Sequence, residues 1–148
     1  MDIKAIENGD FLCLSRTEGY APNEKEKIVE VNFDVVKVEG FDSNRVLVRL
    51  SNSPEVYVYP QYLHGIALSD TVLKRLGWDI VPIDDFNCKY LSEDRSILKA
   101  FNGHGIRIYK DSDQRYFIFH SASRSVDKIE YVHELQKYVK LSNPTLLL

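Results

Sequence analysis

The sequence predicts an α+β fold, with strands throughout and helices only in the C-terminal half. Much of residues 1–62 alternates apolar and polar side chains with the period of two that is typical of strands. Helix-start signals occur later, so helices are expected over about 69–77 and 128–141, together with further strands. No linker composition divides the chain, which predicts a single domain over 1–148 with a β-rich subregion (1–62) and an α+β subregion (63–148).

The N-terminal half predicts short antiparallel strands. Phe11–Leu14 is apolar and follows a turn signal, whereas Glu18–Lys27 is polar and predicts a mobile loop. The apolar run over Ile28–Val38 changes phase at Val35–Val36, where a β-bulge would restore a common inward face. Two further runs alternate cleanly: Arg45–Leu50 and Glu55–Tyr59. Strands of this kind predict a bent antiparallel sheet or a small SH3-like barrel.

Capping residues define the two predicted helices. Ser69 can accept hydrogen bonds from the free amides of the first helix, and Gly77 ends it. Asp127 and Glu130 have the spacing of a capping box, so the second helix is expected to start near Lys128. Asn143–Pro144 would stop that helix. Four segments between the helices predict strands, the last two joined as a hairpin: Phe86–Leu91, Ile97–Phe101, Gly105–Lys110 and Arg115–His120.

Charge and composition exclude two classes of function. The net charge is -3 and the lysines and arginines are scattered, whereas a protein that binds long nucleic acids carries a basic surplus. No apolar run approaches the ~20 residues that a membrane span requires. Residues 1–7 lack the apolar region of a secretory signal. We therefore expect a cytoplasmic protein that binds neither long nucleic acid nor membrane.

No sequence motif gathers catalytic or metal-binding side chains. The four histidines lie on separate predicted elements, whereas a catalytic zinc commonly takes three protein ligands. His133 and Glu134 begin like a zinc protease motif, but Lys137 stands where that motif needs its second histidine. Cys13 and Cys88 form no paired motif and predict buried thiols. The sequence thus predicts no catalytic residue, no metal and no cofactor, and we expect that the protein is not an enzyme.

Tyrosines and arginines on neighbouring strands form the first candidate binding site. Tyr57, Tyr59 and Tyr62 surround a proline, and Arg45 and Arg49 lie on the facing strand. If these side chains share the outer face, they form an aromatic and cationic patch suited to a protein partner or a stacked base. A face covered by another part of the chain explains the same pattern equally well.

Ser123 and Arg124 form a second candidate site. They connect a predicted strand to the helix expected near Lys128, so they could receive an anion at its positive end. Asp127 already occupies the cap position, which favours the alternative of a solvated connection.

Two segments carry a family resemblance. Gly65–Trp78 reads GIALSDTVLKRLGW and Ile129–Gln136 reads IEYVHELQ. They resemble the "ipLteewLlklGF" and "ikyVHqLQnly" segments of an uncharacterised family of small proteins of phages and mobile elements of gut bacteria. Ile6–Phe11 and Asp34–Gly40 are more loosely similar to its "riGnyv" and "ivkVegi" strands. The chain departs from the family's closing "fALTGkeL" at Lys140–Pro144.

This resemblance implies a gene product that acts inside a bacterial cell, and it carries over no catalytic or binding residue. Three hypotheses for its function follow. The first is a non-catalytic accessory protein that binds a host protein, for example to counter an antiviral defence. The second is a small-molecule binder that sequesters an anionic nucleotide signal, with a homo-oligomer helping to build the pocket. The third is a minor virion or assembly component.

Overall fold

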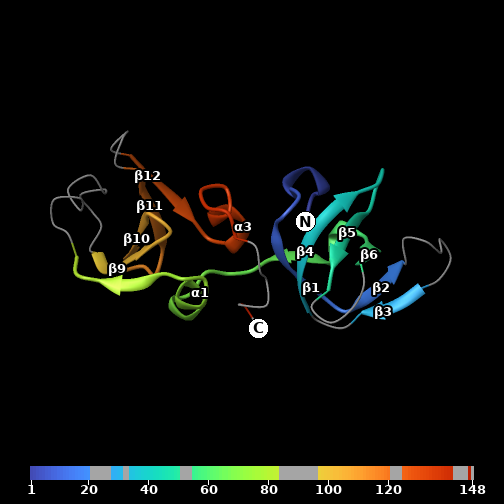
Figure 1. The fold of residues 1–148 in the computed structure, drawn as a ribbon, viewed down its shortest axis with the longest axis horizontal. Helices are drawn as coiled ribbons and strands as arrows, with labels where there is room; N and C mark the ends of the chain where they lie inside the picture. Colours follow the sequence, from blue (N-terminus) through green and yellow to red (C-terminus); the bar gives the residue numbers. More distant parts are fainter. Residues whose placement is uncertain are drawn as a thin grey trace. The chain divides into compact units, whose positions relative to one another are not determined.

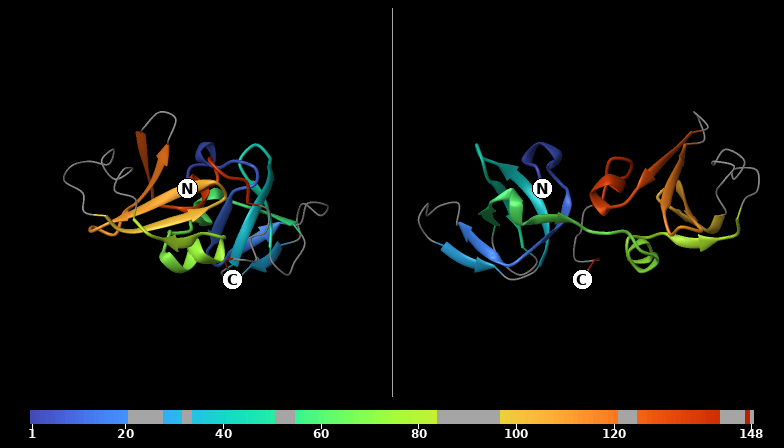
Figure 2. Two further views of the ribbon diagram at one scale, coloured as in Figure 1. Left: turned by 60° about the vertical axis from the view of Figure 1, so that its left-hand side comes forward. Right: turned by 180° about the vertical axis from the view of Figure 1, so that it is seen from behind.

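The chain forms two compact units. Unit 1 holds Met1–Ile66 and Leu135–Leu148, and unit 2 holds Ala67–Glu134. The computed structural model describes residues 1–20, 28–31, 34–50, 55–83, 97–120, 125–141 and 147 (Figures 1 and 2). Several predicted features lie outside these residues: Phe86–Leu91, Cys88, Ser123, Arg124 and Asn143–Pro144. That the two units make a single domain stays a prediction.

Unit 1 is built on a seven-stranded antiparallel sheet (Figure 1). Its strands lie in the order β3-β2-β6-β5-β4-β1-β7. Among the described strands β3 and β7 are therefore edges, and the sheet does not close into a barrel. In chain order its elements are η1 (Ile3–Ala5), β1 (Phe11–Leu14), β2 (Thr17–Tyr20), β3 (Ile28–Val31), β4 (Asp34–Phe41), β5 (Val46–Arg49), β6 (Glu55–Val58), η2 (Pro60–Tyr62) and β7 (Leu63–Gly65).

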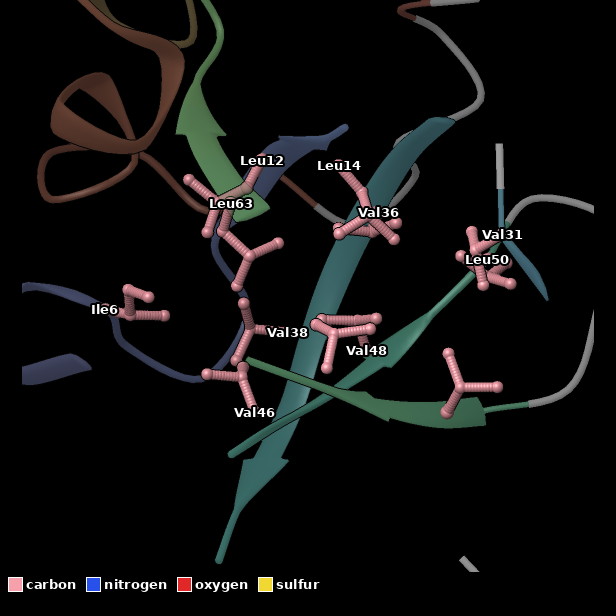
Figure 3. Packing of buried hydrophobic residues seen from close by; sticks show 12 residues of the cluster. Ile6, Leu12, Leu14, Val31, Val36, Val38, Val46, Val48, Leu50 and Leu63 are labelled. Carbon is pink, nitrogen blue, oxygen red and sulfur yellow. The ribbon is translucent and has the colours of Figure 1, made fainter. Parts of the chain in front are cut away.

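Alternation along these strands creates the unit 1 core. Apolar side chains two residues apart point to the same face of a strand, so β5 buries Val46 and Val48 while β6 buries Val56 and Val58. Figure 3 shows side chains from several strands meeting in one cluster. The outward positions of β6 and of the residue after it carry tyrosines, which places Tyr57 and Tyr59 on the opposite face.

The structure corrects the bulge predicted at Val35–Val36. Residues Asp34 to Lys37 pair with β1 in unbroken register, so no extra residue is inserted there. The register shift of β4 lies at Val38–Gly40, opposite β5. The change of phase has another cause: β3 ends at Val31 and β4 begins at Asp34, and these two strands occupy different positions in the sheet.

Unit 2 contains a five-stranded antiparallel sheet with strand order β12-β11-β10-β9-β8. Its elements are α1 (Asp70–Arg75), β8 (Asp79–Val81), β9 (Ile97–Gly103), β10 (Ile106–Asp111), β11 (Tyr116–His120), β12 (Ser125–Ile129) and α3 (Val132–Leu135), whose last residue belongs to unit 1. Both sheets are antiparallel, and the α-helices among the described residues, α1 and α3, are short, which confirms an α+β fold. No helix among the described residues is long and apolar enough to cross a membrane.

Local signals predicted α1 correctly. The Ser69 hydroxyl accepts a hydrogen bond from the Val72 amide at 3.1 Å, which caps the helix. Gly77 follows the helix at φ +103°, a left-handed conformation that favours glycine at a helix end. The β9–β10 hairpin turns through His104 and Gly105, both at positive φ, as a tight two-residue turn requires.

The helix predicted over 128–141 is wrong for most of its length. Ser125–Ile129 forms β12 and pairs with β11, and the following α3 is a single turn. Asp127 lies within that strand, so it caps no helix. The Glu134 carboxylate instead accepts hydrogen bonds from the Glu130 and Tyr131 amides, each at 3.0 Å. Pairing along β11 is available only in the folded sheet, and it outweighs the local helix signal.

Candidate functional site

Three tyrosines and one arginine meet on the outer face of the unit 1 sheet. Tyr20 at the end of β2 pairs with Tyr57 of β6. The Arg45 guanidinium lies 4.7 Å from the centre of the Tyr57 ring and 5.4 Å from that of Tyr20. The Tyr59 ring is nearly perpendicular to the Tyr20 ring, with 5.9 Å between ring centres. We call Tyr20, Tyr57, Tyr59 and Arg45 the tyrosine–arginine cluster.

The turn between β4 and β5 holds Arg45 in place. Nη2 of Arg45 lies 2.6 Å from one oxygen of the Asp42 carboxylate. The backbone N–H of Arg45 donates a hydrogen bond to the other oxygen at 2.8 Å. Partial burial raises the pKa of Asp42, but the hydrogen bonds from Arg45 and Asn44 lower it more, so the pKa lies below its usual value. Asp42 therefore stays ionised at neutral pH. It neutralises the arginine and fixes its position over the two rings.

A cavity of about 710 Å³ opens beside this cluster. Tyr20 and Tyr59 belong to both, and Tyr62 in η2 adds a third ring to the cavity wall. Polar and charged side chains complete the wall: Arg16, Thr17, Glu18 and Gln61. We call this space the tyrosine cavity. An aromatic wall with hydroxyl and amide groups can hold a ligand by ring contacts and hydrogen bonds together.

The two charges of the tyrosine cavity differ in their surroundings. Arg16 takes part in an interaction within the chain. The Glu18 carboxylate is exposed and has no hydrogen-bond or ion-pair partner among the described residues. Because one residue is basic and the other acidic, the described wall carries no net charge. Glu18 is therefore the charged group that remains available to a ligand.

Of the residues predicted to bind, the structure brings Arg45, Tyr57 and Tyr59 into the tyrosine–arginine cluster, and Tyr62 into the adjoining cavity. Arg49 lies apart, because its guanidinium bonds to Glu39 at 3.1 Å and to Glu55 at 2.5 Å. Ser123 and Arg124 are outside the described residues, so their candidate anion site is not tested.

Tyr20 is the cluster residue that sequence reasoning missed. The polar segment from Glu18 onward predicted a loop, but Thr17–Tyr20 is a strand that pairs with β3 along its whole length. In the structure Gly19 is buried between two more exposed neighbours, as strand alternation requires. Because glycine has no side chain, the sequence shows this alternation only weakly. A Cβ atom added at Gly19 would lie 3.1 Å from side-chain atoms of Val31 and Val56.

Hydrogen-bond directions at Ser15 bear on nucleophilic chemistry near the cavity. The Ser15 hydroxyl oxygen lies 3.0 Å from the Tyr62 carbonyl oxygen and 3.1 Å from His64 Nε2, and its single proton can be donated to only one of them. A serine activated for attack needs the histidine nitrogen to accept its proton, and the Tyr62 carbonyl oxygen competes with His64 for that proton. The described residues also contain no group of three or more histidine, cysteine, aspartate or glutamate side chains that could hold a metal ion.

Unit 2 contains a different polar cluster, centred on Asp70 at the start of α1. Its carboxylate accepts hydrogen bonds from Lys99 Nζ at 2.6 Å, Lys110 Nζ at 3.0 Å and the Tyr116 hydroxyl at 2.6 Å. Lys110 also lies 5.5 Å from the centre of the Tyr116 ring. The Asp70 carboxylate is thus paired with two ammonium groups and one hydroxyl, and we call these four residues the Asp70 cluster.

Comparison with known proteins does not indicate a function, so a functional proposal depends on the geometry of the sites described above. The chain matches no protein-family model, and no curated protein or solved structure is similar enough to it to count as a match.

Proposed function

We propose that this chain is a non-catalytic accessory protein of a phage or mobile element that binds a protein of its bacterial host. The binding site is the tyrosine–arginine cluster with the adjoining tyrosine cavity. The observation that carries this proposal is the convergence on one face of Tyr20 at the end of β2, Tyr57 and Tyr59 in and just after β6, and Arg45 just before β5. Interference with a host defence is one role that such binding would serve.

Residue type favours a protein partner at this site. Tyrosine and arginine are enriched among the residues that dominate binding energy at protein interfaces, because their rings and planar guanidinium bury large areas. Tyr59 has 36% of its surface exposed, and Arg45 is already ordered by Asp42. A preordered side chain loses less entropy when a partner binds.

Charge argues against the alternative ligand, an anionic nucleotide. The phosphates of a nucleotide need uncompensated cations or backbone amides. Here Asp42 neutralises Arg45, and Arg16, the one cation of the described cavity wall, shares that wall with the exposed Glu18 carboxylate. Stacking on the tyrosines remains available to a base, so the alternative is tested directly. Native mass spectrometry and thermal shift with cyclic and linear nucleotides should show neither a mass gain nor stabilisation.

Affinity capture from host lysate tests the proposal. The wild-type chain should enrich a host protein that a Tyr57→Ala/Tyr59→Ala variant fails to retain. Tyr131→Ala is the matched control, because Tyr131 is a similarly exposed tyrosine (38%) in unit 2. The control should retain the same protein. Equal capture by the wild type and the double variant contradicts the proposed site, and no specific capture by the wild type contradicts protein binding.

A further inference from the structure

The position of the tyrosine cavity within the sheet restricts the kind of protein segment that it can take. A peptide that adds a strand needs a free sheet edge. Among the described strands the edges of the unit 1 sheet are β3 and β7, whereas the described wall of the cavity comes from β2, from η2 and from the residues beside them. β2, which does line it, pairs with β3 along its length and meets β6 at Tyr20. Recognition in this cavity therefore falls to side chains.

The chemistry of the wall excludes two further modes of peptide recognition. An amphipathic helix needs a broad apolar groove, but the described wall contains no aliphatic side chain. A phosphorylated segment needs clustered arginines, but the wall has one arginine and an opposing glutamate. A general mode that suits an aromatic surface is the recognition of an extended proline-rich segment.

A proline-rich segment also fits the hydrogen-bonding groups of the cavity. Such a segment forms a left-handed extended helix without internal hydrogen bonds, so its carbonyl oxygens need donors. Proline lacks an N–H group, so the segment asks for few acceptors in return. The hydroxyls of Tyr59 and Tyr62 and the Gln61 amide can donate, and the flat tyrosine rings can pack against pyrrolidine rings.

We infer that the tyrosine cavity binds an extended proline-rich segment of the partner, with a basic residue beside the prolines facing Glu18. The basic residue follows from charge complementarity, because the exposed Glu18 carboxylate has no partner among the described residues whereas Arg16 is engaged within the chain. This inference rests on the proposed function and adds the chemical class of the bound segment.

A defined peptide tests the inference with the full chain. The probe is a short fluorescein-labelled peptide with two Pro-x-x-Pro repeats followed by arginine, and fluorescence anisotropy measures its affinity. Replacing its prolines with alanine should weaken binding about tenfold, because the preformed extended helix and the ring contacts are lost. Replacing its arginine with glutamate should also weaken binding, and Glu18→Gln should reduce the preference for arginine.

Protein variants locate the contact. Tyr59→Ala should weaken binding of the proline peptide about tenfold, whereas Tyr131→Ala should leave it unchanged. Tyr59→Phe keeps the ring and removes the hydroxyl donor, so it should lie between the wild type and Tyr59→Ala. Circular dichroism checks that each variant is folded.

The outcomes separate this inference from the proposed function. Equal affinity for the proline and alanine peptides, or equal affinity of the wild type and Tyr59→Ala, overturns the proline-rich segment. If lysate capture still depends on Tyr57 and Tyr59 in that case, the proposed function stands and only the class of bound segment is wrong. If capture also fails, both are wrong.

Discussion

Tyrosines adjoin charged side chains in both units, but they contribute different parts of the side chain. In unit 1, Tyr57 and Tyr20 present their rings to Arg45, and their positions on the outer face leave them partly exposed. In unit 2, Tyr116 is 6% exposed and its hydroxyl is bonded to Asp70. A tyrosine whose hydroxyl and ring are both engaged stabilises a fold, whereas one with a free face can still contact a partner.

Electrostatics strengthen the same contrast. Burial raises the pKa of Asp70, but hydrogen bonds from Lys99, Tyr116 and Lys110 lower it more, so its pKa lies far below the usual value. Burial and the neighbouring Asp70 carboxylate raise the pKa of Tyr116 well above its usual value. Both shifts favour the protonation states found at neutral pH. The Asp70 cluster is therefore a stabilising group, and three of the four predictions below test its difference from the tyrosine–arginine cluster.

The largest effect is expected from Asp70→Asn. The neutral amide cannot accept from two ammonium groups and a hydroxyl with the strength of a carboxylate, and Lys110, only 13% exposed, keeps its charge. We expect a loss of about 3 kcal/mol of unfolding free energy, measured by urea denaturation. Asp113→Asn is the control, since Asp113 is 71% exposed and pairs with Arg115 at the surface. It should change stability by less than about 0.5 kcal/mol. Similar losses in both variants would contradict a special role for Asp70.

The second prediction concerns pH. A carboxylate with a lowered native pKa adds stability above its unfolded pKa of about 3.9, and that stability is lost as pH falls through the native pKa. The wild type should therefore lose more stability than Asp70→Asn as pH falls below about 4. Urea titrations at a series of acidic pH values measure the difference between the two proteins. Parallel pH profiles would show that Asp70 is not the group responsible.

A smaller effect is expected in unit 1, at Gln136. Its side-chain oxygen accepts from the Phe11 amide and its nitrogen donates to the Gly9 carbonyl, each at 2.8 Å. Gln136→Ala leaves both backbone groups without this partner and should cost about 1–2 kcal/mol of unfolding free energy. Lys137→Ala, at the next and exposed position, should be nearly neutral. An unchanged stability of Gln136→Ala would show that the C-terminal segment does not depend on this contact.

The smallest effect on stability is expected at the proposed binding site itself. Tyr59→Ala removes a ring that is 36% exposed and borders the cavity, so it should change unfolding free energy by less than about 1 kcal/mol. Its effect on partner binding should be large. A loss as great as that of Asp70→Asn would contradict the distinction between the two clusters, because it would make Tyr59 a core residue.

Much of the fold was predictable where the deciding interactions are local. The Ser69 cap, the Gly77 terminator and the β10–β11 hairpin each depend on residues within a few positions of one another. The inward faces of β5 and β6 were also predicted correctly, because side-chain alternation within a strand needs no knowledge of its neighbours.

The errors occur where a distant partner decides. The segment Ser125–Ile129 carries a helix-start pattern, yet it lies beside β11 and pairs with it. The phase change after Val31 looked like a bulge, because the sequence does not show that β3 and β4 lie in different parts of the sheet.

The proposed binding site shows the same division. By itself the sequence determined which side chains of β5 and β6 alternate with the buried valines, and it left open whether Arg45 and Tyr57 share an exposed face. Only the tertiary structure shows that Tyr20 lies on the same face and that a cavity opens next to Tyr59. It also shows that Arg49 forms ion pairs with Glu39 and Glu55 and so lies outside the site. The alternation of side chains is a property of one strand. Which side chains of different strands lie next to each other depends on the order of the strands in the sheet, and the packing of the whole core sets that order.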